Sequence, residues 1–136
     1  MRQITHIVVH CSATPQTTTV ESIRNYWKNK LKWEYPGYHY IIQADGTIVH
    51  LLDISQKSNG VAGWNHTIIN VCYIGGITAD KKQIDNRTQE QKQSLKVLLQ
   101  SLKKNFPHAI IKGHRDFPGV KKDCPCFNAQ TEYSKL

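Results

Sequence analysis

Two histidines and one cysteine in this chain have side chains that can bind a metal ion, and both histidines stand where a strand is expected to end. His10 ends the first expected strand, His114 follows the last one, and Cys124 stands ten positions further on. Neutral imidazole and thiolate both suit Zn²⁺ in a tetrahedral site. Three protein ligands would leave the fourth position to water, which is typical of a catalytic zinc site.

Spacing alone leaves other interpretations of these residues open. A single histidine is more often a surface residue or a hydrogen-bonded core residue than a metal ligand. The pair Cys124-Pro125-Cys126 is not a C-x-x-C motif, so it indicates neither a zinc ribbon nor a thioredoxin-like site. Cys126 could be a bystander or an alternative ligand. Cys11 and Cys72 are expected to be small buried residues.

The elements that would position these residues alternate between strands and helices. A β-branched run at Ile7-Val8-Val9 is typical of a buried strand, and Asp45-Gly46 is typical of a hairpin turn. Thr18-x-x-Glu21 and Thr88-x-x-Gln91 have the form of capping boxes, each followed by apolar residues at helical spacing. We expect strands over 4–10, 38–43, 47–51, 71–74 and 109–112, helices over 20–32 and from 88 to Pro107, and a short helix after Phe127.

These elements predict an α/β fold with a mixed central β-sheet flanked by helices, because the hairpin adds an antiparallel pair. A chain of 136 residues fits one domain, 1–136. No apolar run approaches the roughly 20 residues of a membrane span, so we expect no membrane insertion. Residues 1–10 contain one arginine and a short apolar stretch, so we expect no signal peptide, and without one reduced thiols are expected.

The net charge of +8 predicts attraction to a polyanion, which could be nucleic acid, an anionic membrane or an anionic cell-wall polymer. The basic residues are scattered in small clusters, and a solvated surface is the simpler account of each cluster. Nothing resembles a helix-turn-helix, zinc-finger or RNA-binding motif, so no specific nucleic-acid binding is expected. A basic nucleic-acid-binding protein with a structural zinc is an alternative that rests on the charge alone.

Five short motifs, spread from about Ile4 to Phe127, carry a resemblance to a known family. They are His10-Cys11-Ser12-Ala13-Thr14, Gly37-Tyr38-His39-Tyr40-Ile41-Ile42, Asp45-Gly46-Thr47, Gly63-Trp64-Asn65-His66, and His114-Arg115-Asp116 leading to Lys122-Asp123-Cys124-Pro125. In this order they resemble the type-2 N-acetylmuramoyl-L-alanine amidases, which include bacteriophage T7 lysozyme and share their fold with peptidoglycan recognition proteins. The chain departs from the family pattern at Lys28, where many relatives carry histidine, and in its longer loop from His114 to Cys124.

The resemblance implies one Zn²⁺ per chain, held by His10, His114 and Cys124. It favours Cys124 over the second cysteine of the pair because Lys122 then stands two residues before the ligand, as in the family. It also implies that Tyr38 and Lys122 assist catalysis. The lysine ammonium could stabilise the developing oxyanion, and the tyrosine could orient water or hydrogen-bond the tetrahedral intermediate. No glutamate matches a general base, which stays unassigned.

The resemblance also places two residues of the fourth motif near substrate. His66 matches a cleft position that would contact substrate, and Trp64 could either stack on a sugar or cover the core. In the second motif, His39 alternates with the neighbouring tyrosines and is expected to be structural, and Tyr40 is expected to be a core residue.

The activity that the resemblance implies is zinc-dependent hydrolysis of the amide between N-acetylmuramic acid and L-alanine in peptidoglycan. Made in the cytoplasm without a signal peptide, the protein could be a phage or prophage endolysin that acts on the cell wall after release. A cytoplasmic amidase that recycles muropeptides and an effector secreted by a signal-independent route are alternatives. A peptidoglycan-binding module without catalysis is another, although Cys124, Tyr38 and Lys122 argue against it. We expect a monomer whose partner is peptidoglycan or a muropeptide.

Overall fold

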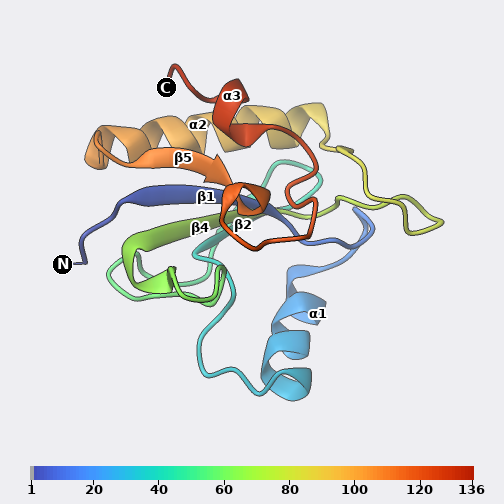
Figure 1. Ribbon diagram of the computed structural model, residues 1–136. Coiled ribbons are helices and arrows are strands. Elements are labelled where there is room, and N and C mark those ends of the chain that lie inside the picture. The colour runs from blue at the N-terminus through green and yellow to red at the C-terminus, as the bar shows by residue number, and fades with distance from the viewer. Residues whose placement is uncertain (1) are drawn as a thin grey trace.

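A five-stranded sheet in the order β3-β2-β4-β1-β5 forms the centre of the protein (Figure 1). The computed structural model describes residues 2–136. The strands are β1 (His6–Cys11), β2 (Tyr40–Ile42), β3 (Ile48–His50), β4 (Ile68–Tyr73) and β5 (Ile110–Gly113). β1 runs parallel to β4 and β5, and β2 runs parallel to β4, whereas β2 and β3 are antiparallel. The predicted mixed sheet is therefore confirmed.

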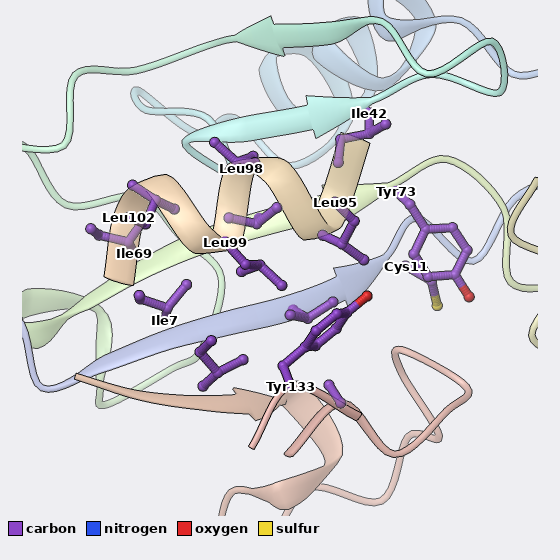
Figure 2. Packing of buried hydrophobic residues seen from close by; sticks show 14 of the residues in the cluster. Ile7, Cys11, Ile42, Ile69, Tyr73, Leu95, Leu98, Leu99, Leu102 and Tyr133 are labelled. Carbon is purple, nitrogen blue, oxygen red and sulfur yellow. The ribbon is translucent and has the colours of Figure 1, made fainter. Parts of the chain in front are cut away.

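The long helix α2 (Gln89–Asn105) and the short helix α3 (Ala129–Glu132) cover one face of the sheet (Figure 1). Figure 2 shows Leu95, Leu98, Leu99 and Leu102 of α2 packed along the buried residues of the central strands. α2 begins at the predicted capping box, in which Thr88 and Gln91 cap each other's backbone N–H groups. The apolar stripe of the sequence thus forms the larger part of the core.

The opposite face of the sheet is covered by α1 (Val20–Asn25), which continues as a π-helical turn, η1 (Tyr26–Lys30). Ile23 and Trp27 on this segment pack against Ile41 and Cys72 of the sheet. The predicted helix is present, but its N-cap is Thr19, one residue later than the capping box predicted, because the Thr19 hydroxyl accepts the Ser22 N–H.

Strand alternation sorts the residues of β1 and β4 between these two faces. Ile7, Val9 and Cys11 face α2, as do the equivalent residues of β4. His10 and Asn70 therefore belong to the α1 face of the sheet. β4 begins three residues earlier than predicted. The prediction excluded Asn70 because asparagine is depleted in strands, but Asn70 lies buried inside β4.

The remaining connections lie at the edges and ends of the sheet. Asp45-Gly46 forms the predicted hairpin turn, in which Gly46 has a φ of +89°. η2 (Asn65–Thr67) precedes β4, and η3 (His114–Asp116) follows β5. No helix within residues 2–136 is long and apolar enough to cross a membrane.

Candidate metal centre

The carboxyl ends of two neighbouring parallel strands bring the three candidate ligands together. His10 is the penultimate residue of β1, and His114 directly follows β5, which pairs with β1. The loop that follows η3 returns to the same place with Cys124. The ligand atoms of the three residues all lie within 4.8 Å of one another. Among the described residues, this is the one group of three or more such side chains that could hold a metal ion.

The chemistry of this donor set fits zinc. His10 and Cys124 are buried and His114 is half-buried, so most of the site is shielded from water. Neighbouring ligand atoms around tetrahedral zinc are about 3.5 Å apart when the bonds are about 2.0–2.3 Å long. Small side-chain shifts would therefore close the site. The Cys11 backbone N–H lies 3.1 Å from the Cys124 sulfur and donates a hydrogen bond to it.

Both imidazoles are held in the neutral form that binds metal. Burial lowers the pKa of His10 to about 3, with further lowering by the neighbouring His114. Burial also lowers the pKa of His114, and the positive charge of Lys122 acts in the same direction. Because protonated imidazole cannot bind a metal ion, these shifts keep the ligands available at neutral pH.

The two residues expected to assist catalysis line the same cavity as the three ligands. The Tyr38 ring is 4.9 Å from the His10 ring and 5.4 Å from the Trp27 ring, measured between centroids. Burial, and then the thiol of Cys72, raise the pKa of Tyr38 well above its ordinary value. The hydroxyl therefore stays protonated and can donate a hydrogen bond. Lys122 is exposed and borders the cavity from the loop that ends at the cysteine ligand.

The two residues expected to contact substrate lie outside this cavity lining. His66 is exposed in η2. The Trp64 ring packs edge-to-face against Phe117 at 5.2 Å and His6 at 6.0 Å. Phe117 belongs to a buried cluster with Val8, so Trp64 packs at the edge of the core while its side chain stays 37% exposed.

The other cysteines have positions distinct from the ligand position. Cys11 and Cys72 are buried, as expected. Cys126 lies 3.9 Å from the Cys11 sulfur and 3.5 Å from the Gly76 carbonyl oxygen, outside the group of three ligands. All four cysteines are free.

Two features of the site were missed from the sequence. Trp33, partly exposed, lines the cavity beside Trp27. Asn70, fully buried on β4, places its Oδ1 2.7 Å from Nε2 of His10. A polar amide inside the apolar run from Ile68 to Tyr73 was the available signal, because a buried polar side chain needs a partner.

Comparisons with known proteins agree with this geometry. Residues 1–127 match the model of the family Amidase_2, described as N-acetylmuramoyl-L-alanine amidase. The chain is 38% identical over 132 residues to the endolysin of Escherichia phage T7, covering 95% of this chain and 85% of that protein. It is 36% identical over 136 residues to the endolysin of Klebsiella phage KP32, covering 98% of this chain and 88% of that protein. The fold is similar to that of the peptidoglycan recognition protein PGRP-SA of Apis mellifera, with a TM-score of 0.79 at 16% identity, covering 100% of this chain and 84% of that one.

Proposed function

The chain belongs to the N-acetylmuramoyl-L-alanine amidase family and is an amidase, and from this we propose that it is a zinc-dependent endolysin. Its family and enzyme class, both predicted from the motifs, are confirmed. Its proposed reaction is hydrolysis of the amide between the lactyl group of N-acetylmuramic acid and L-alanine in peptidoglycan. Water adds to the carbonyl carbon, the C–N bond breaks, and the L-alanine nitrogen leaves as an amine after taking up a proton.

The observation that carries this proposal is the convergence of His10, His114 and Cys124 on one cavity with Tyr38 and Lys122. The three ligand residues would hold a single Zn²⁺. A zinc ion in such a site lowers the pKa of a bound water to about 7 and polarises a carbonyl group. The proposed metal centre thus supplies a nucleophile at neutral pH.

Tyr38 and Lys122 would stabilise the negative charge that develops on the carbonyl oxygen. Burial raises the pKa of Tyr38, so its hydroxyl is protonated at neutral pH and can donate a hydrogen bond. Lys122 would contribute a positive charge at the cavity mouth, where it is exposed and can meet substrate. Preorganised donors of this kind act most strongly where water is excluded.

The cell-wall role is supported by the relatives of this chain, which are named endolysins and match over nearly its whole length. We propose that the protein acts on intact peptidoglycan as a monomer after its release from the cytoplasm. The net charge of +8 would favour association with an anionic cell wall.

The deciding experiment measures newly exposed L-alanine amino groups on purified sacculi. We expect activity to be lost with a chelator, to return with Zn²⁺, and to be lost in Cys124→Ser. The matched control, Cys126→Ser, should keep activity, because Cys126 lies outside the ligand group. Full activity of Cys124→Ser at ordinary zinc concentrations would disprove the ligand set.

A second comparison separates the endolysin from a recycling amidase. The rate on intact sacculi is measured beside the rate on soluble anhydro-muropeptides. An endolysin should turn over sacculi efficiently, whereas a marked preference for the soluble substrate would favour recycling. Tight binding of muropeptide by zinc-loaded protein without turnover would instead favour a binding module.

A further inference from the structure

We propose that Asn70 is a positioning residue that fixes the His10 imidazole with hydrogen on Nε2, leaving Nδ1 for the metal ion. The proposal rests on the zinc site proposed above. Asn70 is the single strongly polar residue of β4 and is fully buried on the face that carries His10. Its Oδ1 lies 2.7 Å from His10 Nε2, so the two side chains are joined directly.

The direction of this hydrogen bond follows from a chain of hydrogen bonds that begins at His39. His39 Nε2 lies 2.7 Å from the Gln56 carbonyl oxygen, which can only accept, so Nε2 donates. His39 is neutral because burial lowers its pKa to about 4. Its Nδ1 therefore accepts, and the Asn70 backbone N–H donates to it at 3.0 Å. The Gln56 carbonyl at 2.7 Å and the Asn70 N–H at 3.0 Å thus fix the same tautomer, and both are closer than Arg2 Nη2, a donor 3.4 Å from His39 Nε2.

Ser58 links His39 to the Asn70 amide and determines which way the amide is oriented. The buried Ser58 hydroxyl lies 3.2 Å from His39 Nδ1 and donates its hydrogen there, sharing this acceptor with the Asn70 backbone N–H. The Ser58 oxygen is then free to accept, and Asn70 Nδ2 lies 2.7 Å away. The amide consequently points its NH₂ group at Ser58 and its oxygen at His10. That oxygen cannot donate, so His10 Nε2 must carry the hydrogen.

Gly60 provides the space for this amide. A Cβ atom at position 60 would lie 2.3 Å from Asn70 Cγ and from Asn70 Oδ1, closer than such atoms approach one another. The Asn70 amide therefore fits in this position only because residue 60 is a glycine. A larger residue at position 60 would therefore displace the amide from its place beside His10.

The consequence for the metal centre is a ligand that is oriented before the metal binds. A metal-binding histidine commonly donates its second N–H to an oxygen acceptor, which fixes the tautomer and ring orientation. Loss of such an acceptor typically weakens metal affinity by about 10–100-fold. Here the acceptor is a neutral amide anchored through Ser58 and His39 to the Gln56 backbone.

The test compares Asn70→Leu, which removes the acceptor at similar size, with Asn70→Asp, which keeps an oxygen toward His10. Zinc affinity is measured by competition with a chromophoric chelator. The His10 tautomer is read from two-bond ¹H–¹⁵N correlations of the zinc-free protein. We expect Nε2–H in the wild type. Asn70→Leu should weaken zinc binding by about 10–100-fold, and its His10 should no longer be held in a single tautomer. Asn70→Asp should keep a zinc affinity near that of the wild type and keep the Nε2–H tautomer.

Two outcomes would overturn the proposal. One is unchanged zinc affinity in Asn70→Leu, and the other is a His10 that carries its hydrogen on Nδ1 in the wild type. Should Asn70→Leu not fold, Ser58→Ala serves in its place, with a several-fold loss of affinity expected and no loss contradicting the inference. A wild-type protein that binds no zinc in the same titration would instead refute the proposed function.

Discussion

At the cavity, the two residues proposed to assist catalysis are held by different parts of the fold. Tyr38 is partly buried between the rings of His10 and Trp27, just before β2. Lys122 is exposed in the loop that ends at Cys124, and its side chain borders the cavity without being packed into it. The tyrosine hydroxyl is therefore positioned before substrate binds, whereas the lysine can adjust to the bound substrate.

We expect Tyr38→Phe to lower kcat by about 10²–10³, because it removes one hydrogen-bond donor from a shielded site. Zinc affinity should be unchanged, since the ring that packs on His10 remains. Tyr40→Phe is the matched control, because Tyr40 instead stacks on His50 with centroids 4.7 Å apart. Steady-state rates on a soluble muropeptide provide the measurement. Equal rates for the two variants would exclude the role of the Tyr38 hydroxyl.

Lys122→Met should likewise lower kcat by about 10²–10³, through loss of the charge that opposes the developing oxyanion. The neighbouring Lys121→Met removes the same charge from the surface outside the cavity lining and should leave kcat nearly unchanged. Measuring both variants on the same soluble substrate separates the local role from the effect of net charge. A similar loss in both would indicate that only the overall field matters.

Buried His39 should make the stability of the protein depend on pH. Its pKa is about 4 in the folded protein because burial disfavours the charged form, against an ordinary value of 6.5. Between these values the unfolded chain binds a proton that the folded chain does not. The free energy of unfolding is therefore fully retained above pH 6.5 and falls as the pH is lowered, by up to about 3 kcal/mol below pH 4.

Urea unfolding of the zinc-free protein at pH 7 and pH 5 measures this dependence. His39→Gln should reduce this dependence but not abolish it, because the pKa values of His6, His10 and His114 are lowered in the same direction. His108→Gln, at an exposed position, should behave as the wild type does. The assignment to His39 fails if His39→Gln keeps the full wild-type dependence.

At the scale of the elements, hydrophobic periodicity and capping motifs were sufficient to predict the sheet and α2. The stripe on α2 and the β-branched run of β1 each have a single interpretation, and both form as predicted. The start of β4 was wrong because Asn70 looks unfavourable for a strand until its partners are known. Local sequence does not contain those partners, since Ser58 and His10 come from other segments.

The candidate site was predictable to the same extent. The three candidate ligands could be selected because the motifs that contain them are specific in combination, and the structure brings these side chains together. The substrate-contact assignment of His66 stays a prediction, since its side chain lies outside the cavity lining. Trp33 was missed because it lies in a segment without periodicity, where only the three-dimensional arrangement shows what a side chain faces.

Arg87 connects the segment before α2 to the C-terminal helix α3. Its buried guanidinium lies 2.9 Å from Asp85 and Glu132 oxygens and 3.4 Å from the centroid of the Phe127 ring. The two carboxylates are partly exposed, which weakens each pair through solvent screening. The arrangement nevertheless holds the segment that follows Cys124 against the core.

We expect Arg87→Met to lower the free energy of unfolding by about 2–4 kcal/mol. The substitution leaves the carboxylates of Asp85 and Glu132 without the buried guanidinium that pairs with them. Lys82→Met, which breaks the exposed pair with Asp80 at 3.6 Å, should cost much less, because solvent screens that pair. Both values come from denaturant unfolding of the zinc-free protein. A cost below about 1 kcal/mol for Arg87→Met would show that packing alone holds α3.

At the scale of the whole molecule, the charge of +8 should act on binding to the cell wall and not on the chemical step. Long-range attraction between the protein and an anionic polymer is screened by salt, with a Debye length of about 10 Å at 0.1 M. The proposed metal centre is largely buried, so its local interactions are screened much less. Salt should therefore separate the two contributions.

We expect the rate on intact sacculi to fall by about tenfold between about 0.02 M and 0.3 M salt, while the rate on a soluble muropeptide changes little. The double variant Lys92→Glu/Lys96→Glu tests whether net charge is the cause. Both lysines are exposed on α2 and lie outside the cavity lining. The two substitutions change the net charge from +8 to 8 − 4 = +4. This variant should lose activity on sacculi at low salt and keep it on the soluble substrate. If salt lowered the hydrolysis rates on both substrates equally, the positive charge would act at the cavity. The effect would then be attributed to Lys122 and not to the surface as a whole.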